Sequence, residues 1–354
     1  MSRPEAAYPE ALVSIAARVE ERILLLLDAE LARWRAVDPL LEAPLVALRD
    51  FIAAGGKRLR PAFCYSAYVG AGGDPESSTI VDAAAALELT HTFALVHDDV
   101  MDGSELRRGR DAIHRQFMRA HHAEHGRGEA RRFGEGMAIL IGDFAHVYAD
   151  LLMRDATPTA RDVFDTLRIE LSVGQSLDLV NTARATTDGA AARRIAQYKS
   201  AKYTVERPLH LGAALAERLD DLAPHLSAFG LPLGGAFQLR DDILGAFGDA
   251  DVTGKPVGDD LREGKVTPLV ASAAAHAEPA DQALLDRLGA PDLDENDVAA
   301  LQDLFVRTGA LKEAEAEIDR LVTEARDALA VSPLTPAAKS HLGELATYVA
   351  WRDR

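Results

Sequence analysis

The sequence predicts an all-α protein, and three features of the chain support this fold class. Aromatic residues make up only 6% of the 354 residues, while alanine, leucine, arginine and glutamate abound, and this composition favours helices over strands. Apolar residues recur at helical spacing along most of the chain. We find no internal repeat, linker or low-complexity stretch, so residues 1–354 are interpreted as one domain.

In the first half of the chain, helices are expected at about 9–34, 62–69 and 77–101. The second of them should end at the glycine-rich run Gly70–Pro75, which contains strong turn formers. The third should begin at Ser77, a favourable N-cap residue, and continue through an alanine-rich body. Residues 121–136 are polar, contain four glycines and lack an apolar period, and are predicted to form a loop.

In the second half, helices are expected at about 137–154, 159–183, 190–215 and 219–247. Pro208 should kink or break the third of these helices. Residues 249–265 combine glycine and proline with many charges and are predicted to be a functional loop. The C-terminal third is helical again, and residues 333–336 should separate the last two helices.

Charge and cysteine content exclude several classes of protein. The net charge of −17 argues against a nucleic-acid partner, because a phosphate backbone requires a basic surface. Cys64 is the only cysteine, so it forms no intramolecular disulfide or multi-cysteine zinc site, and its apolar neighbours predict a buried thiol. We see no secretory signal and no apolar run that could anchor the chain in a membrane, so a cytoplasmic location is expected.

An acidic motif lies at the end of the helix expected at 77–101. Asp98 and Asp102 are spaced i, i+4 and therefore share one helical face, where their charges repel unless a cation neutralises them. Carboxylates are preferred ligands for Mg²⁺ when a substrate phosphate completes its coordination, and the following Arg107 and Arg108 suit phosphate oxygens. The alternative is a solvated acidic helix end with arginines as salt-bridge partners.

A second acidic motif, Asp241–Asp242, follows an almost wholly apolar stretch, residues 229–239. Carboxylates emerging from a buried helix are costly unless they are paired, which favours a metal site over an exposed charged loop. More charged residues follow in the glycine-containing segment; they are Asp249, Lys255, Asp259, Asp260 and Lys265.

A basic cluster, Gly55–Pro61, precedes the helix expected at 62–69. It contains Lys57, Arg58 and Arg60, and its glycines free the backbone, so an anion site is plausible. The cluster lacks the spacing and terminal Ser or Thr of a nucleotide P-loop. A solvated basic turn remains the alternative.

Taken together, these residues resemble the trans-isoprenyl diphosphate synthases, also called polyprenyl synthetases, and among them the geranylgeranyl diphosphate synthases most. The resemblance rests on segments in the family's order and approximate spacing, which are residues 55–61, 98–109, 199–200, 237–238 and 241–242. It implies an isoprenoid-synthase-type helix bundle around a central cavity, a homodimer, and Mg²⁺ as cofactor, with three ions per site and Mn²⁺ as a possible substitute. The implied reaction condenses isopentenyl diphosphate with an allylic diphosphate such as dimethylallyl, geranyl or farnesyl diphosphate.

The resemblance also implies roles for individual residues of this chain. The metal ligands would be Asp98, Asp102 and Asp241, with Asp99 and Asp242 acting through water or orienting their neighbours. Isopentenyl diphosphate would be bound by Lys57, Arg60, His91 and Arg108. The allylic diphosphate would be bound by Arg107, Lys199, Ser200, Gln238, Lys255 and Lys265. Further expected pocket residues are Gln175, Asp178, Phe237, Asp249 and Asp260.

One position departs from the family pattern, because the second motif usually ends in a third aspartate where this chain has Gly245. Either the metal relies on Asp241 and Asp242, or Asp249 compensates from the loop. The second site is therefore expected to be less crowded than usual.

Product length is expected to depend on the helix before Asp98. Phe93 lies five residues upstream, roughly 7.5 Å along a helix axis, and Ala94 is small. This combination resembles one class of geranylgeranyl (C20) synthases; a farnesyl (C15) or a longer product is the alternative. Two alternative functions belong to other classes. A class I terpene cyclase would not need Lys57, Arg60 and Arg108, and a non-catalytic regulatory subunit should have lost metal ligands.

Overall fold

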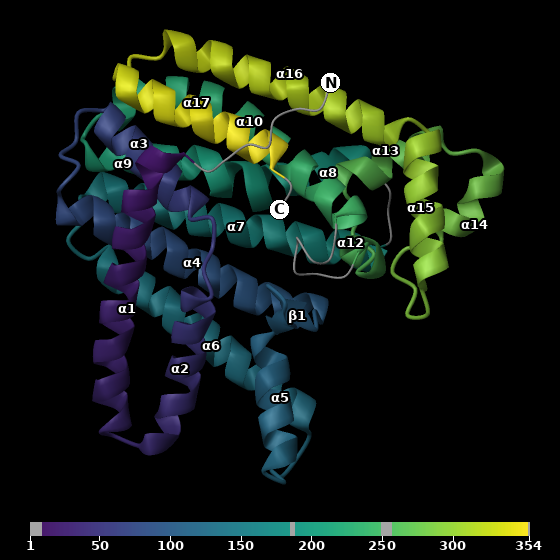
Figure 1. The fold of residues 1–354 in the computed structure, drawn as a ribbon, viewed down its shortest axis with the longest axis horizontal. Coiled ribbons are helices and arrows are strands. Elements are labelled where there is room, and N and C mark those ends of the chain that lie inside the picture. The colour runs from purple at the N-terminus through teal and green to yellow at the C-terminus, as the bar shows by residue number, and fades with distance from the viewer. Residues whose placement is uncertain (1–8, 185–187, 249–256, 353–354) are drawn as a thin grey trace.

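Helices account for nearly all regular structure in residues 9–184, 188–248 and 257–352, the parts of the chain that the computed structural model describes (Figure 1). The helices of the first half are α1 (Val13–Arg35), α2 (Glu42–Ala53), α3 (Leu59–Gly70), α4 (Ser78–Asp102), α5 (Ile113–Ala123), α6 (Ala130–Leu152) and α7 (Pro158–Arg184). A two-stranded antiparallel hairpin, β1 (Leu106–Arg107) and β2 (Arg110–Asp111), follows α4. The prediction of an all-α fold is confirmed.

The second half begins with three helical segments that continue into one another. These are α8 (Gly189–Ile195), a π-helix, η3 (Ala196–Glu206), and α9 (Arg207–Leu215). They are followed by α10 (Leu219–Phe247), α12 (Asp259–Arg262), α13 (Pro268–His276), α14 (Gln282–Leu285), α15 (Glu295–Arg307), α16 (Ala310–Val331) and α17 (Pro336–Trp351). Short 3₁₀ turns cover Glu10–Leu12, Pro39–Leu41 and Pro279–Asp281.

The long helix α4 lies inside the bundle and is packed against α6, α3 and α1. Its first turn is capped by Ser77, whose hydroxyl accepts a hydrogen bond from the backbone N–H of Thr79 at 3.2 Å, as predicted. By length and composition α4 could cross a membrane, but 67% of its apolar window is buried within the protein. Its hydrophobicity is therefore explained by its place in the core.

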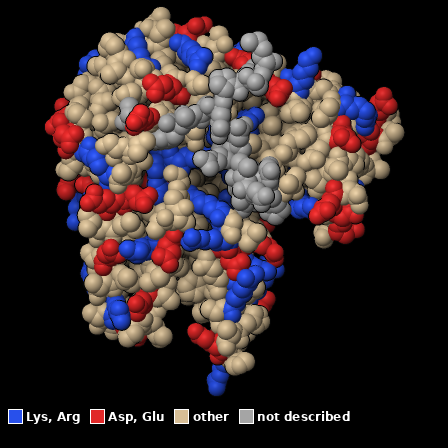
Figure 2. Space-filling model, in the orientation of Figure 1, with Lys and Arg blue, Asp and Glu red and all other residues tan. Residues whose placement is uncertain are grey.

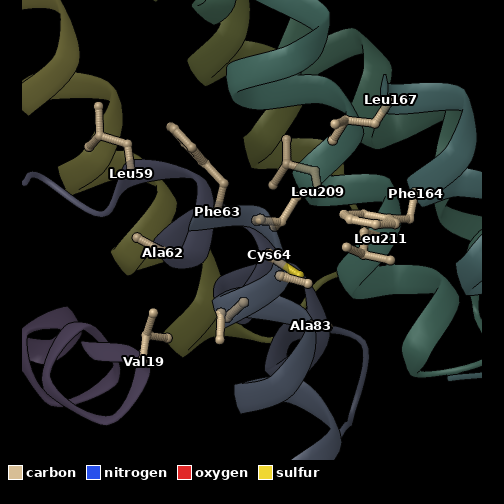
Figure 3. Close-up of a cluster of buried hydrophobic side chains, with 14 of the residues drawn as sticks. Val19, Leu59, Ala62, Phe63, Cys64, Ala83, Phe164, Leu167, Leu209 and Leu211 are labelled. Atoms are coloured by element: carbon tan, nitrogen blue, oxygen red, sulfur yellow. The ribbon is translucent and has the colours of Figure 1, made fainter. Parts of the chain in front are cut away.

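The main core lies where α1, α3, α4, α7 and α9 meet (Figure 3). Phe63 and Cys64 of α3 point into this cluster together with Phe164 of α7 and Leu209 of α9 (Figure 3). Cys64 is fully buried, and burial raises the pKa of its thiol, so the predicted core thiol is confirmed. A second cluster surrounds α13, α15 and α16, and α10 contributes side chains to both clusters.

Glycines allow the π-helix to be packed very closely between two other helices. A Cβ at Gly174 of α7 would lie 2.4 Å from the backbone nitrogen of Lys199, and one at Gly234 of α10 would lie 2.4 Å from the Cα of Ala201. Both separations are shorter than real contacts, so no larger residue fits. The π-helix ends at Glu206 and α9 begins at Arg207, so the backbone changes helix type just before Pro208 but does not break there, and the break predicted at Pro208 is not found.

Two other sequence-based expectations about local structure were wrong. Residues 121–136 are not a single loop, because α5 continues to Ala123 and α6 already begins at Ala130. The glycines misled the prediction: Gly134 lies within α6, where a Cβ would be 2.2 Å from the carbonyl oxygen of His114, so it permits close helix packing. The expected loop at 249–265 contains the short helix α12, and residues 249–256 lie outside the described parts.

Candidate active site

The C-terminal end of α4 faces a cavity of about 590 Å³. His91, Ala94 and Asp98 line the cavity, as their spacing of three or four residues on a helix predicts. The helix ends at Asp102, and Gly103 (φ 70°) takes the left-handed conformation that turns the chain away. Figure 2 shows the molecule in the orientation of Figure 1, and lysine and arginine side chains gather near the middle of the face that it shows.

Asp98 is bound by side chains from two other elements. The Nζ of Lys199 lies 3.0 Å from its Oδ1, and the Nε2 of Gln175 donates to the same oxygen at 2.9 Å. Lys199 also pairs with Asp178 at 2.6 Å. Burial acts to raise the pKa of Asp98, but the Lys199 ammonium and other nearby cations outweigh burial and lower this pKa to about 2. Asp98 is therefore a carboxylate at any physiological pH.

Asp102 has a different electrostatic environment from Asp98, although both belong to the same motif. Its Oδ2 lies 2.7 Å from the Nζ of Lys265, which also pairs with Glu263. Burial raises the pKa of Asp102 to about 6, and the negative charge of Asp98 adds to this effect against the opposing Lys265. The first acidic motif therefore contains one firmly ionised carboxylate and one that holds its proton more tightly.

Asp99 points roughly 100° away from Asp98 around the axis of α4 and supports the cavity wall. It is almost fully buried and pairs with Arg107 of β1, whose Nε lies 2.9 Å from the Asp99 Oδ1. Arg107 itself lines the cavity. This salt bridge holds the guanidinium of Arg107 at the cavity wall.

The second acidic motif lies near the C-terminal end of α10. Asp242 is 2% exposed and accepts a hydrogen bond from the Nε2 of Gln238 at 2.6 Å. Its other oxygen, Oδ2, is buried without a hydrogen-bond partner in the described parts of the chain. Burial raises the pKa of Asp242 well above its ordinary value. Asp241 forms a salt bridge with Arg352, whose guanidinium lies 4.3 Å from the ring centroid of Phe237.

The space beside Gly245 is occupied by an acid from another helix. A Cβ built on Gly245 would lie only 2.0 Å from Oδ2 of Asp260 and 2.7 Å from its Cγ. The carboxylate of Asp260, at the start of α12, therefore occupies the place that a side chain at position 245 would need. Asp249, which the sequence suggested as a compensating acid, lies outside the described residues.

A group of cations lines the cavity on the side of α3. The Nη2 of Arg60 donates to Oγ1 of Thr204 at 2.8 Å, and its guanidinium lies 4.2 Å from the ring centroid of Tyr203. His91 is buried nearby, and its Nδ1 has no partner in the described structure. Burial, together with the charges of Arg60 and Arg108, lowers the pKa of His91 well below its ordinary value, so its ring is neutral at pH 7.

Two arginines hold the backbone of the basic loop. Arg108 donates to the carbonyl oxygen of Gly55 and lies 5.4 Å from the ring centroid of Phe51. Arg58 is 4% exposed and forms salt bridges with two acids. One is the buried Glu88, and the other is Glu20, whose Oε2 lies 3.0 Å from the Arg58 Nη2. Arg58 thus anchors the loop to α4 and α1, and both Arg58 and Arg108 line the cavity as well.

The structure brings most of the sequence-predicted site residues to one cavity. Its lining includes Lys57, Arg60, His91, Ala94, Asp98, Arg107, Arg108, Gln175, Asp178, Lys199, Ser200, Phe237, Gln238, Asp241, Asp242, Asp260 and Lys265. Asp99 forms a salt bridge with the cavity-lining Arg107, and Asp102 forms one with the cavity-lining Lys265. Phe93 packs instead between the rings of His97 and His146, at centroid distances of 4.6 and 4.7 Å. Lys255 and Asp249 lie outside the described residues.

Several contributors were not found from the sequence. Glu88 had a usable signal, since it is a carboxylate within the apolar body of α4. Glu170 of α7 binds Lys202 at 2.7 Å and Arg207 at 2.6 Å, and so fastens the middle of the π-helix and the first residue of α9 to α7. Arg352 had no signal, because its partner Asp241 is 111 residues away in the chain.

Comparison with known proteins supports the same assignment. The family model "Polyprenyl synthetase" matches residues 42–305. The geranylfarnesyl diphosphate synthase of Aeropyrum pernix is 33% identical over 311 residues, covering 85% of this chain and 92% of that protein. The geranylgeranyl diphosphate synthase of Saccharolobus solfataricus is 34% identical over 261 residues, covering 71% of this chain and 73% of that protein.

A solved structure extends the similarity to three dimensions. The geranylgeranyl pyrophosphate synthase of Corynebacterium glutamicum, complexed with isoprenyl diphosphate and magnesium, superposes with a TM-score of 0.92. The two proteins are 33% identical, and the match covers 96% of this chain and 99% of that one. The two proteins therefore share the helical architecture described above.

Proposed function

The chain belongs to the polyprenyl synthetase family and is a prenyltransferase that makes trans-prenyl diphosphates. From this premise we propose that the reaction depends on Mg²⁺ and that its main product is geranylgeranyl diphosphate (C20). In this reaction isopentenyl diphosphate condenses with an allylic diphosphate. One observation carries the proposal: two acidic motifs and two sets of cations, from segments far apart in the sequence, face one cavity.

The donor chemistry of the site fits a divalent metal, although no three such side chains are gathered around one point in the described parts of the chain. Carboxylate oxygens are the ligands that Mg²⁺ prefers, and Asp98, Asp102 and Asp241 would hold it, with Asp242 in support. The buried Oδ2 of Asp242 has no partner among the described residues, which suits a site completed by a cation or its water. When bound, Mg²⁺ neutralises charge that develops on the departing diphosphate.

The cations of the cavity suit an allylic diphosphate on the side of the acidic motifs. Lys199 and Lys265 are already held there by Asp98 and Asp102. Because these ammonium groups are fixed before substrate arrives, they can stabilise the leaving diphosphate without a further cost of reorganisation. The C–O bond of the allylic substrate breaks, and the electron pair leaves with the diphosphate.

The second substrate is assigned to the basic cluster on the side of α3. Lys57 and Arg60 lie at the cavity wall, and the neutral His91 adds a hydrogen-bonding group without adding charge. The double bond of isopentenyl diphosphate attacks the allylic cation, and the resulting carbocation loses a proton. A cavity lined partly by Leu171, Phe237 and other apolar side chains limits the access of water to the cation.

The C20 product is supported by the relatives and by α4. Relatives include geranylgeranyl, farnesyl and geranylfarnesyl diphosphate synthases, so membership of the family leaves the length open. Ala94 lines the cavity and leaves room beside it, while Phe93 fills the space towards α6. We assign the product limit to this pair.

We also propose a homodimer, as the family resemblance implied. Stripes of exposed apolar side chains run along α6 and α7, and consist of Leu140, Val147 and Leu151, and of Ile169, Val173, Leu177 and Val180. Arg168 of α7 binds Asp150 of α6 at 2.6 Å, which places the two stripes side by side. A paired apolar face of this kind is typical of a subunit interface. Light scattering of the purified protein should give twice the mass of the 38.0 kDa chain.

The function is tested with purified protein, Mg²⁺, isopentenyl diphosphate and each allylic primer in turn, with the products identified by mass. We expect elongated diphosphates that accumulate at C20. A cyclised hydrocarbon from a single substrate would indicate a terpene cyclase, and the absence of any product would indicate a regulatory subunit; either result contradicts the proposal.

A further inference from the structure

We propose that Glu206, a buried acid at the end of the π-helix, is a positioning residue that keeps this helix wound so that Lys199 faces the diphosphate site and Glu206 does not. A chain of hydrogen bonds through Ser227 and His210 holds the Glu206 carboxylate in place. The inference rests on the assignment of Lys199 to the allylic diphosphate in the proposed function, and it adds the residues that fix the orientation of that lysine.

The winding of the π-helix separates two side chains that an α-helix would bring together. Residues seven positions apart lie on the same face of an α-helix, so Lys199 and Glu206 would then both face the cavity. The π-helix, Ala196–Glu206, has about one residue more in each turn. Lys199 therefore lines the cavity, whereas Glu206 is 4% exposed, lies outside the cavity lining and contacts α10.

Glu206 is held by hydrogen bonds whose direction follows from the donors available. The Ser227 hydroxyl has one hydrogen and donates it to Oε1 of Glu206 at 2.7 Å. The Nε2 of His210, 3.0 Å from the same hydroxyl, is then the ring nitrogen that carries a proton and donates it to Ser227. The Nδ1 of His210 accepts from Nη1 of Arg207 at 3.0 Å, because an arginine can only donate. The His210 ring is therefore neutral, and burial lowers its pKa in agreement with this.

The chain of hydrogen bonds joins three helical segments at one point. It begins at Arg207 and ends at Glu206, which are neighbours at the junction of α9 and the π-helix, and it passes through Ser227 of α10. Arg207 also binds Glu170 of α7 at 2.6 Å. A Cβ at Gly230, about one turn after Ser227, would lie 3.0 Å from the Cα of Glu206, so α10 also contacts the backbone here. A change in the winding would disturb these contacts together.

Release of Glu206 would affect the binding of both diphosphates. A shift towards α-helical winding would turn its carboxylate to the side of Lys199, where its negative charge repels a diphosphate. The same shift would move two contacts of Arg60, which are the Thr204 hydroxyl at 2.8 Å and the Tyr203 ring at 4.2 Å. The KM values for both substrates should therefore rise when Glu206 loses its partner.

The test compares Ser227→Ala with Ser227→Thr, which keeps the hydroxyl, in the steady-state kinetics of the full chain with Mg²⁺. Ser227→Ala should raise both KM values by about threefold to tenfold, as expected for the loss of one hydrogen bond, with a smaller change in kcat. Ser227→Thr should stay within about twofold of the unaltered protein. Adding Glu206→Gln to Ser227→Ala should recover part of the lost affinity, because the released side chain then carries no charge.

A control and a second measurement separate displacement of the π-helix from general damage. Ser340→Ala removes a hydroxyl that donates to an exposed acid, Glu344 of α17, at 3.2 Å, and should change neither KM. Hydrogen exchange followed by mass spectrometry should be faster for residues 196–206 in Ser227→Ala and unchanged for α16. If Ser227→Ala does not fold by circular dichroism, Ser227→Cys replaces it, since a thiol is of similar size and donates only weakly.

The outcomes distinguish this inference from the proposed function. If Lys199→Met leaves the KM for the allylic diphosphate unchanged, the assignment of Lys199 fails and this inference fails with it. If Lys199→Met raises that KM but Ser227→Ala does not, or if Ser227→Thr is impaired as much as Ser227→Ala, the role of Glu206 is overturned while the function stands. Faster hydrogen exchange in every helix of Ser227→Ala would likewise overturn that role, because it indicates a general loss of stability.

Discussion

Arg352 forms a salt bridge with Asp241, so a residue that follows the last helix is fixed to the second acidic motif. The attachment is reciprocal, because the Nε of Arg240 donates to the backbone carbonyl oxygen of Arg352 at 2.7 Å. The Arg352 side chain is 1% exposed, whereas that of Asp241 is 41% exposed. The buried guanidinium of Arg352 therefore neutralises part of the charge of the acidic motif, while the exposed part of the Asp241 side chain still faces the cavity.

Arg352→Met should destabilise the metal-free protein by about 1–2 kcal/mol, a value below that for a fully buried pair because Asp241 is half-exposed. The loss should be smaller in Mg²⁺ and pyrophosphate, since the added cation then neutralises Asp241. Urea denaturation in EDTA and in Mg²⁺ with pyrophosphate measures both values.

Arg326→Met is the control for the Arg352 substitution, because Arg326 is exposed and donates to Thr347 of α17 at 2.7 Å. It should change stability by no more than about 0.5 kcal/mol in either buffer. An equal loss for Arg352→Met with and without the metal would show that Arg352 only packs the C-terminal helix.

The raised pKa of Asp102 predicts a stability difference that depends on pH. Its pKa is about 6 in the folded protein against an ordinary value of 3.8, so the folded state binds this proton more tightly. The stabilisation from that proton is complete below pH 4 and is lost as the pH rises through 6. Without metal, Asp102→Asn should therefore be more stable than the unaltered protein at pH 7.5, by about 1–3 kcal/mol, and the gain should shrink towards pH 4.5.

Denaturation at the two pH values in EDTA tests this prediction for Asp102. With Mg²⁺ and pyrophosphate the order should reverse, because the variant lacks a ligand. Asp221→Asn, an exposed acid of α10, serves as the control and should show neither effect. A variant that is less stable than the unaltered protein at pH 7.5 in EDTA would show that the Lys265 contact outweighs burial.

Sequence reasoning was most successful where the signal is local. Ser77 marked the beginning of α4, and the expected limits of α10 agree with the structure. It failed at Gly134, because a glycine that permits close helix packing and a glycine that ends a helix look alike in one sequence. The π-helix was also missed, since the same apolar positions fit an α-helix over so short a stretch.

The site divides in the same way. Asp98, Asp241 and their neighbours form short motifs that indicate their chemistry from residue type and spacing alone. Asp260 beside Gly245 and Arg352 beside Asp241 depend on tertiary packing, which no local pattern encodes. The sequence pointed to the gap at Gly245 and could not show what fills it.

Product length should respond differently at two adjacent positions of α4. Ala94→Phe should shorten the product to C15, because residue 94 lines the cavity directly. Phe93→Ala should lengthen it, because removing the ring between His97 and His146 opens space towards α6. Product masses from reactions with farnesyl and geranyl diphosphates provide the measurement. The assignment of α4 as the product limit is contradicted if both variants give the unaltered distribution.

Glu170 should position the π-helix that carries Lys199 and Ser200. Its carboxylate binds Arg207 through two nitrogens, at 2.6 and 2.8 Å, and Lys202 at 2.7 Å. Glu170→Gln should cost about 1–3 kcal/mol of stability through weaker charged hydrogen bonds. Because Lys199 then loses its fixed place beside Asp98, the KM for the allylic diphosphate should rise by about fivefold to tenfold, with a smaller effect on kcat.

A general loss of folding would behave differently from a displaced π-helix. It would lower the amount of active enzyme, and so kcat, and leave KM unchanged. Asp165→Asn removes an exposed partner of Arg168 on the same helix and should alter neither constant. Lys202→Met and Arg207→Met should each reproduce part of the KM increase, since each removes one attachment of the π-helix region to α7. A normal KM in all three variants at Glu170, Lys202 and Arg207 would mean that Gly174 and Gly234, through close packing alone, keep Lys199 in place.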